Sequence, residues 1–293
     1  MTYPDGLRTQ IDDYLEQLRF SDESLTSRLV EAMRYSLLAG GKRIRPVLAL
    51  ATARAIGRDE RELLPLAAAI ELIHTYSLIH DDLPAMDDDS LRRGRPTNHV
   101  AFGEEVAILA GDGLYAEAFR HVLQRQRGEP ADVLAAVAEL AAATAVDGMV
   151  GGQYLDVAGI AVEHPEPAHA LRRTHELKTG RLIGASVECV LLIAGMSRST
   201  TTAYRTFAAE LGVLFQIVDD ILDVTGTDAA LGKPQGSDER HGKRTYVTEF
   251  GLDGARGLAE RSHREARASL AAAAPGGAPE LEQITDFIAT RSS

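Results

Sequence analysis

Apolar residues recur at three- and four-residue intervals along most of the chain, whereas alternating stretches of β-branched residues are nearly absent. Leu29, Met33 and Leu37, for example, fall four positions apart within residues 24–38, and a glycine pair follows them. This spacing places apolar side chains on one face of a helix, and glycines are typical of helix ends. The pattern therefore predicts an almost entirely helical protein.

The rest of the chain repeats this pattern, with short polar breaks between the periodic segments. Pro46 opens a segment that runs from Val47 to Ile56, as expected of a proline in the first helical turn. The longest stretch without periodicity, residues 225–243, is rich in Gly, Asp and Lys and predicts a functional loop. Further helices are expected at 63–82, 104–125, 131–157, 166–195, 201–224, 251–272 and 278–290. We therefore predict one all-α domain over residues 1–293, built as a large helical bundle.

Composition limits the classes of function. The 293 residues are 45% hydrophobic and carry 43 acidic against 31 basic side chains, a formal net charge of −12. This excess argues against nucleic acid as the main partner, because binding a phosphate backbone needs a broad basic face. A single cysteine, Cys189 in an apolar run, excludes an intrachain disulfide and is expected to be buried. The N-terminal residues are polar and no apolar stretch reaches about 18–20 residues, so we expect a cytoplasmic protein without a membrane anchor.

Three aspartates, Asp219, Asp220 and Asp223, interrupt an apolar helical run. Asp219 and Asp223 are four residues apart, so their carboxylates share a helix face and repel each other. Burial would raise the cost of this repulsion, whereas a divalent cation between the carboxylates would turn it into ligation. Oxygen ligands favour Mg²⁺, which commonly uses one or two carboxylates together with substrate phosphates. The cluster therefore predicts a magnesium site.

A second acidic group follows another apolar run, in residues 80–94. Asp81 and Asp82 end the helix, and Asp87 follows six residues after Asp81, about 120° away from it on a straight helix. A turn distorted at Pro84 would bring Asp87 back to the same side. Either cluster alone is as well explained by a solvated acidic surface. Two clusters on apolar helices, more than a hundred residues apart, favour a paired metal site.

Basic residues lie in short motifs beside the same helices. Arg and Lys next to Mg²⁺ suit the oxygens of a diphosphate, because Arg binds two oxygens at once and Lys acts as a point charge. Each one alone is an ordinary surface cation, but together with the acidic clusters they predict Mg²⁺-bridged diphosphates whose organic tails enter an apolar bundle. The motifs contain Lys42, Arg43, Arg45, Arg92, Arg93, Arg95, Lys178, Thr179, Arg181, Lys233 and Lys243.

Several motifs follow one another along the chain: GGKRIRP, YSLIHDDLPAMDDDSLRRGRPT, GGQYLDV, KTGRLI, FQIVDDILDVTGT and LGKPQGSD…GKRTY. In this order they resemble the trans-isoprenyl diphosphate synthases from about residue 24 onward, most of all the bacterial farnesyl diphosphate synthase type. The resemblance implies an all-α bundle of the isoprenoid synthase type with a central active-site cavity, usually a homodimer. It also implies three Mg²⁺ ions and the head-to-tail condensation of isopentenyl diphosphate with an allylic diphosphate.

The resemblance also implies a role for each motif residue. The metal ligands would be Asp81 and Asp87, with Asp82 in support, and Asp219 on the third ion, with Asp220 and Asp223 nearby. The allylic diphosphate would be held by Arg92, Lys178, Thr179, Gln216 and Lys233, and Lys243 would close over it. The isopentenyl diphosphate site would comprise Lys42, Arg45, His74 and Arg93. The expected catalytic residues are Asp81, Asp82, Asp87, Arg92, Lys178, Asp219 and Lys233. Gln153 and Asp156 would line the site, and the role of His80 is open.

Product length is expected to depend on the residues before the first aspartates. Tyr76 lies five residues before Asp81, about 7.5 Å back along a helix, on the path of a growing tail. A bulky ring there would block elongation, whereas the small Ser77 would not add to the block. In the family, an aromatic at this position together with four residues between Asp82 and Asp87 resembles a stop at farnesyl diphosphate.

Four alternatives remain: Tyr76 as an ordinary core residue, geranyl or geranylgeranyl diphosphate as the product, a terpene cyclase, or a non-catalytic subunit of a heteromeric prenyltransferase. The three aspartates of the second cluster argue against a cyclase, whose second motif normally brings Asn, Ser or Thr and Glu. The intact motifs argue against a non-catalytic subunit.

Overall fold

The computed structural model describes residues 3–159, 165–226 and 243–291. In this part the chain forms helices and one short antiparallel hairpin, in which Leu91 pairs with Pro96 and Arg92 with Arg95. The elements are α1 (Asp5–Glu16), η1 (Ser24–Thr26), α2 (Ser27–Leu37), α3 (Ile44–Ala55), η2 (Glu60–Leu63), α4 (Leu64–Asp81), β1 (Leu91–Arg92), β2 (Arg95–Pro96), α5 (Asn98–Phe102), α6 (Glu104–Arg125), α7 (Pro130–Thr144), α8 (Met149–Val157), α10 (Pro167–His175), the π-helical turn η3 (Glu176–Gly180), α11 (Arg181–Ile193), α12 (Arg198–Thr225), α15 (Tyr246–Ala273) and α16 (Pro279–Thr290).

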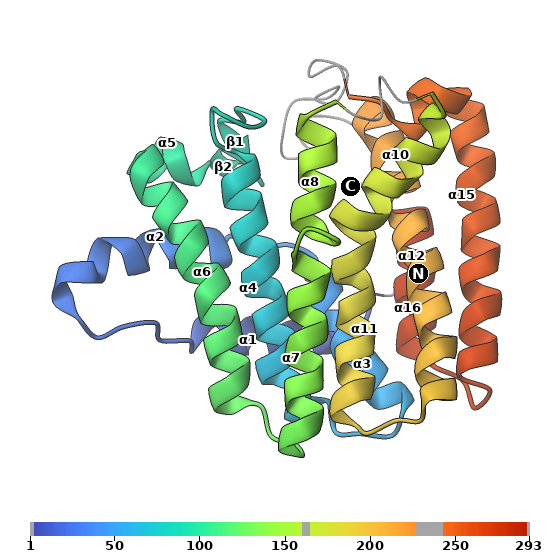
Figure 1. Cartoon of the computed structure of the whole chain (residues 1–293), viewed down its shortest axis with the longest axis horizontal. Helices are drawn as coiled ribbons and strands as arrows, with labels where there is room; N and C mark the ends of the chain where they lie inside the picture. Colours follow the sequence, from blue (N-terminus) through green and yellow to red (C-terminus); the bar gives the residue numbers. More distant parts are fainter. Residues whose placement is uncertain (1–2, 160–164, 227–242, 292–293) are drawn as a thin grey trace.

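The long helices lie side by side as a bundle, with the hairpin, α5, α8 and α10 gathered at one end (Figure 1). Helix α12 packs along α15, α4 along α6, and α7 along α11. One continuous core of buried apolar side chains joins the helices from Leu7 in α1 to Ile288 in α16. The predicted all-α bundle is therefore what the chain forms.

Helix α4 lies inside the bundle because it is apolar on nearly every side. Every residue from Leu66 to Ile73 is buried, as expected of a helix without a polar face. The helix ends at Asp81, so this buried helix places a carboxylate at the end of the bundle. Helix α6 approaches α4 closely there, because a Cβ atom added to Gly111 would collide with the imidazole of His80.

Most predicted helices agree with the structure to within a few residues, and α6 agrees at both ends. The single helix expected at 131–157 was wrong, because the chain breaks between α7 and α8. Gly148 lies in this break and passes so close to the backbone of Ala143 that no side chain would fit. The expected helix at 166–195 contains the π-helical turn η3, and α15 starts earlier than expected and bends at Gly251 (φ 70°).

Three elements were not predicted from the sequence: α1, α5 and the hairpin. The predicted functional loop at 225–243 lies almost wholly outside the described residues. Cys189 is buried as predicted, and its thiol contacts the carbonyl oxygen of Ala136 at 3.3 Å.

By length and composition alone, two helical segments could cross a membrane, Glu60–Asp81 and Pro130–Val157. Neither segment contains an uninterrupted apolar run of 18 residues, because Glu71 divides the first and Glu139 and Asp147 divide the second. The apolar window of the first segment is 61% buried, as in the core helix of a bundle, and that of the second is 39% buried. The second segment therefore leaves more apolar surface uncovered.

Candidate active site

A cavity of about 550 Å³ opens at the end of the bundle where α4 and α12 finish. Both aspartate clusters line it, although they are more than a hundred residues apart in the sequence. Lys42 and Asp82 are not among its lining residues, and Lys233 lies outside the described residues. Gln153 and Asp156, expected to line the site, do so, as does His80. The other predicted site residues that line the cavity are Arg45, His74, Tyr76, Ser77, Asp81, Asp87, Arg92, Arg93, Lys178, Thr179, Gln216, Asp219, Asp220, Asp223 and Lys243.

The first aspartate cluster folds back on the end of α4. The backbone N–H of Asp87 donates to the carbonyl oxygen of Asp81 at 2.9 Å, and that of Asp88 donates to Leu83 at 3.1 Å. These bonds close a turn that brings Asp87 to the side of Asp81, as the sequence required of the segment around Pro84. Burial raises the pKa of Asp81, with Lys178 acting in the opposite direction. A cation is therefore needed to keep this carboxylate charged at low cost.

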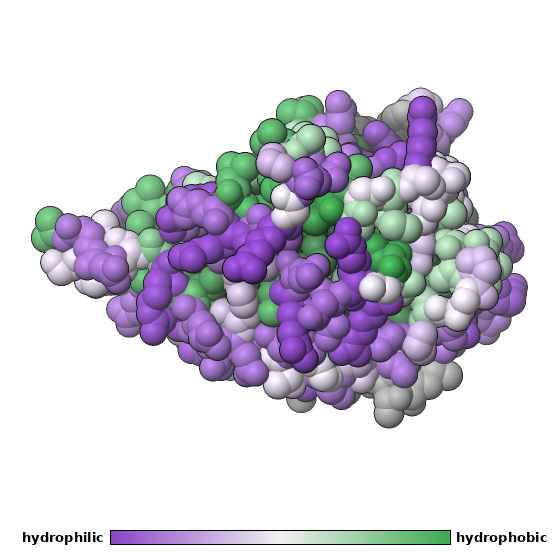
Figure 2. Space-filling model, turned by 90° about the horizontal axis from the view of Figure 1, so that it is seen from below, coloured by the Kyte–Doolittle hydropathy of each residue, from purple (hydrophilic) through white to green (hydrophobic). Residues whose placement is uncertain are grey.

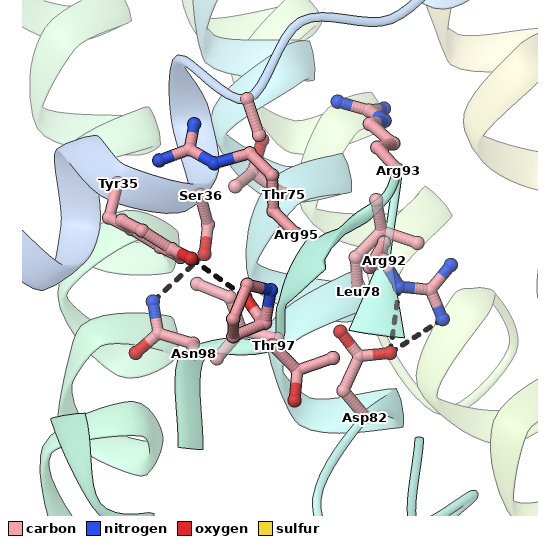
Figure 3. A pocket seen from close by; sticks show the side chains of 13 residues that line it. Tyr35, Ser36, Thr75, Leu78, Asp82, Arg92, Arg93, Arg95, Thr97 and Asn98 are labelled. Carbon is pink, nitrogen blue, oxygen red and sulfur yellow. Dashed lines mark hydrogen bonds and ion pairs between the residues drawn. The ribbon is translucent and has the colours of Figure 1, made fainter. Parts of the chain in front are cut away.

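Asp82 points away from the main cavity and holds Arg92, which comes from β1. Its Oδ1 accepts from Nε and Nη2 of Arg92 at 2.7 and 2.6 Å, next to a small second cavity of about 30 Å³ (Figure 3). Burial raises the pKa of Asp82 to about 6, against the effect of Arg92. Because Arg92 lines both cavities, Asp82 fixes the direction in which the guanidinium faces the main one.

The three aspartates of the second cluster have different surroundings on α12. Asp219 and Asp223 are one turn apart and both line the cavity. Asp220 instead receives protein donors on both oxygens, from Gln216 Nε2 at 2.8 Å and from the backbone N–H of Tyr246 at 2.7 Å. Gln216 in turn accepts from the Thr179 hydroxyl at 3.0 Å. Asp220 therefore ties α12 to the start of α15, and its metal role stays a prediction.

Basic side chains cross the cavity to reach carboxylates on other elements. Lys178 lies 2.6 Å from Asp156, while Lys243 lies 2.8 Å from Asp87 and 3.4 Å from Asp156. Although burial acts to raise the pKa of Asp156, these two ammonium groups lower it overall. The cavity is thus an alternating array of anionic and cationic groups, suited to a charged ligand that carries its own cations.

Of the predicted isopentenyl diphosphate residues, Arg45 lies on α3 and His74 on α4, whereas Lys42 precedes α3 and Arg93 lies in the hairpin turn. Arg45 is partly buried near the ring of Phe215 (5.7 Å from the centroid), and desolvation lowers its pKa to about 10. Burial, with Arg45 and Arg93 adding to it, lowers the pKa of His74, so its imidazole is neutral at pH 7. Lys42 is exposed instead, with Nζ 5.4 Å from the centroid of Phe287. Its site role stays a prediction.

Arg43 lies between Lys42 and Arg45 and was expected among the diphosphate-binding basic residues, but it does not line the cavity. Its backbone is left-handed (φ 53°), which is uncommon for a side chain other than glycine. The buried guanidinium lies 2.6 Å from Glu71 and 2.9 Å from Asp12, and it donates to the carbonyl oxygen of Leu37 at 2.8 Å. These contacts hold the turn from which Lys42 and Arg45 project.

Several cavity residues were missed from the sequence, and His175 and Arg291 are two of them. His175 lies one turn before Lys178, its ring centroid is 5.4 Å from that of Tyr246, and its Nδ1 is buried without a hydrogen-bond partner among the described residues. Burial lowers its pKa to about 4. Arg291 follows α16 and donates to Asp219 at 3.0 Å. The spacing of His175 from Lys178 was a usable signal, whereas nothing in the sequence links Arg291 to Asp219.

Tyr76 lines the cavity and packs edge-on against two other rings. Its centroid is 5.4 Å from that of His80 and 4.9 Å from that of Tyr115 on α6. Burial raises the pKa of Tyr76 to about 12, so its hydroxyl stays protonated. Ser77 also lines the cavity, and its hydroxyl donates to the carbonyl oxygen of His74 at 2.9 Å. A bulky aromatic wall therefore lies on the α4 side, where the sequence expected it.

A model of the polyprenyl synthetase family matches residues 26–273. The chain belongs to the polyprenyl synthetase family. It is 46% identical over 253 residues to the farnesyl diphosphate synthase of Geobacillus stearothermophilus, covering 86% of this chain and 83% of that protein. It is 42% identical over 297 residues to the chloroplastic geranylgeranyl pyrophosphate synthase of Catharanthus roseus, covering 99% and 81%. The structure of a geranyltransferase from Helicobacter pylori, complexed with magnesium and isoprenyl diphosphate, is 31% identical, with a TM-score of 0.86 and coverage of 98% and 97%.

The family membership and the all-α fold confirm the two corresponding predictions from the sequence. The chain is a short-chain trans-isoprenyl diphosphate synthase, and its activity is that of a trans-prenyltransferase. Because the polyprenyl synthetases most similar to it include both farnesyl and geranylgeranyl diphosphate synthases, the length of its product is a separate question.

Proposed function

We propose that the chain condenses isopentenyl diphosphate with dimethylallyl and then geranyl diphosphate, and stops at (2E,6E)-farnesyl diphosphate. The observation that carries the farnesyl product is the Tyr76 ring, which lines the cavity five residues before Asp81 and is backed by Tyr115. The alternative is the same reaction ending at geranylgeranyl or geranyl diphosphate. The 42% identity to the Catharanthus roseus enzyme over nearly the whole chain favours the twenty-carbon product as the second candidate.

We propose Mg²⁺ as the cofactor, three ions when substrate is bound. In the described residues no three Asp, Glu, His or Cys side chains converge closely enough to hold a metal alone. Carboxylates on opposite walls fit Mg²⁺ nevertheless, because this ion commonly keeps waters and shares one or two carboxylates with substrate phosphates. Asp81 and Asp87 would hold two ions and Asp219 the third, with Asp223 nearby. Bound Mg²⁺ would supply positive charge to the departing diphosphate.

The cationic side chains of the protein would bind the two diphosphates at separate places in the cavity. Arg92, Lys178 and Lys243, with Thr179 and Gln216, would bind the allylic diphosphate, and Lys233 is proposed there from the motif alone. Arg45, His74 and Arg93 would bind isopentenyl diphosphate beside them. These groups are preorganised to stabilise charge on the leaving diphosphate as the allylic C–O bond breaks.

The carbon chemistry then needs no nucleophilic side chain. The double bond of isopentenyl diphosphate attacks the allylic cation and forms the new C–C bond. Loss of a proton to the released diphosphate restores an allylic diphosphate that is one isoprene unit longer. The apolar stretch of the cavity beside Tyr76 would hold the tail and exclude water from the cation.

We also propose that the chain works as one domain and as a homodimer. Most of the exposed large apolar side chains in the described part of the chain lie on α6, α7, α8 and the loop between α7 and α8, as in Leu109 (55% exposed), Leu134 (58%) and Val146 (77%). Apolar patches reach the surface among charged side chains in the view from below (Figure 2). Exposed apolar side chains gathered on neighbouring helices of a bundle fit a second copy of the chain.

The deciding experiment is a product assay by mass spectrometry. Purified protein with Mg²⁺ and isopentenyl diphosphate would receive dimethylallyl, geranyl or farnesyl diphosphate in separate reactions. Farnesyl diphosphate from the first two primers, with the third left unextended, supports the proposal. A twenty-carbon product supports the second candidate, and no product from any primer overturns the catalytic assignment.

Asp81→Ala and Asp219→Ala test the metal assignment in the same assay. Each is expected to lower turnover by several orders of magnitude with an unchanged helical circular dichroism spectrum, because the charge on the leaving diphosphate loses its support. Glu117→Ala, on the outer face of α6, serves as the matched control and is expected to keep full turnover. Unchanged turnover in both aspartate variants would remove the metal assignment.

A further inference from the structure

The turn between α2 and α3 is held in place by side chains. Both of its glycines have positive φ (81° and 121°), and within the described part of the chain residues 40–42 take part in no backbone–backbone hydrogen bond. Two of its carbonyl oxygens accept from distant side chains instead. Arg93 donates to Gly40, and the Tyr3 hydroxyl donates to Lys42 at 2.7 Å. The position of this turn therefore depends on residues far away in the sequence.

The N-terminal segment contacts two successive residues of the turn. Tyr3 lies two residues before α1 and bonds Lys42, and Asp12 on α1 lies 2.9 Å from the guanidinium of Arg43. Burial raises the pKa of Tyr3, so its hydroxyl keeps its proton and acts as the donor. Because α1 is anchored in the core, the segment is a firm support for the turn.

The ring of Tyr3 also supports the other end of Lys42. The Tyr3 centroid is 4.8 Å from that of Phe287 on α16, and the Lys42 ammonium lies 5.4 Å from the same Phe287 centroid, within the range of a cation–π contact. Arg291 follows Phe287 by four residues, about one helical turn or 5.4 Å, and lines the cavity. Phe287 therefore holds the ammonium of an exposed lysine close to the cavity wall.

We infer that Tyr3 is a positioning residue for the isopentenyl diphosphate site. Its hydroxyl fixes the backbone of Lys42, and its ring supports the ring over which the ammonium lies. A lysine that is ordered before binding loses less rotamer freedom when it meets a diphosphate, so the site binds more tightly. The inference rests on the proposed function, since it takes isopentenyl diphosphate as the ligand of Lys42.

The experiment measures steady-state kinetics of the full chain with Mg²⁺, isopentenyl diphosphate and geranyl diphosphate. Tyr3→Phe keeps the ring and removes the hydroxyl. It is expected to raise the KM for isopentenyl diphosphate about three- to tenfold, as for the loss of one neutral hydrogen bond. Both kcat and the KM for geranyl diphosphate are expected to stay the same, because the side chains proposed to hold the allylic diphosphate lie on other elements. A general loss of structure would change all three values.

The route through Lys42 is tested by a double-mutant cycle. Lys42→Ala is expected to raise the KM for isopentenyl diphosphate by itself, and adding Tyr3→Phe is expected to raise it no further. Tyr14→Phe is the matched control, because it removes a hydroxyl from α1 that lies 2.9 Å from His121 instead of at the turn. This control is expected to leave the KM for isopentenyl diphosphate unchanged.

Three results would overturn the inference: an unchanged KM for isopentenyl diphosphate in Tyr3→Phe, an equal rise for both substrates, or a full effect of Tyr3→Phe without Lys42. Isothermal titration calorimetry with isopentenyl diphosphate measures the same loss as a Kd. If the wild type made no product from any primer, the proposed function would fail, and the ratio of Kd values for Tyr3→Phe and wild type would still decide the inference.

Discussion

Single residues decide much of the geometry at the open end of the bundle, and Arg43 shows how. Its side chain is 2% exposed, as is that of its partner Glu71. Taking two charges out of water is costly, and their contact offsets this cost only while both remain. The pair therefore holds the left-handed turn from which Lys42 and Arg45 project.

Arg43→Met is expected to lower the free energy of unfolding by about 3–5 kcal/mol, because Glu71 would stay buried without its counter-ion. Urea unfolding followed by circular dichroism measures this loss. Adding Glu71→Leu is expected to recover part of the stability but not the affinity for isopentenyl diphosphate. Arg58→Met, at an exposed arginine 4.0 Å from Glu62, is the matched control and should cost less than about 1 kcal/mol. A similar loss in both single variants would show that the buried pair has no special weight.

At the scale of elements, the sequence predicts a helix most accurately where the spacing of its apolar residues reflects only their burial in the core. Helix α6 was placed correctly at both ends. Helix α1 was missed although Leu7, Ile11 and Leu15 have the right spacing and are buried, because the segment is otherwise polar. The turn of the hairpin consists of Arg93 and Gly94, both with positive φ. An arginine in the sequence does not predict such a turn.

The site was predictable in part for a similar reason. The aspartate clusters stand out because charges inside apolar helices need an explanation, and such a signal is local. Pairs such as Lys243 with Asp87 join residues 156 positions apart, and only the packed bundle brings them together. Sequence spacing does not predict a contact over that separation.

The docking of α1 on α6 predicts a pH effect. The Tyr14 hydroxyl lies 2.9 Å from His121 Nε2, and burial, with Arg125 adding to it, lowers the pKa of His121 to about 4. An unfolded chain binds this proton near pH 6.5, so His121 stabilises the fold above pH 6.5, and the contribution is lost as the pH falls towards 4. Wild type is expected to lose about 1 kcal/mol more than His121→Gln between pH 7.5 and pH 5.0, allowing for partial exposure.

Urea unfolding of both proteins at the two pH values measures this difference. Tyr14→Phe removes the hydroxyl and leaves His121 in place. Its free energy of unfolding should therefore change with pH in parallel with that of the wild type. If the gap between wild type and His121→Gln were the same at both pH values, His121 would not be the group that titrates.

For the whole molecule, the apolar face on α6 to α8 predicts the assembly state. Leu109→Glu together with Leu134→Glu is expected to convert the proposed dimer into a monomer, because two charges would be buried on each side of the contact. Sedimentation equilibrium measures the mass of the assembly. Leu25→Glu, at a residue 92% exposed near the start of α2, is the control and should stay dimeric. A wild type that sediments as a monomer would contradict the proposal directly.

The close approach of α6 to α4 at Gly111 sets a boundary for redesign of this enzyme. Rings can be exchanged for smaller ones along the tail path, because a side chain removed there leaves room. The backbone at Gly111 offers no such freedom while His80 keeps its position, since even one methyl group would meet the imidazole ring. Variants with longer products are therefore to be sought among side chains that can shrink, while position 111 works as a fixed gauge of the distance between the helices.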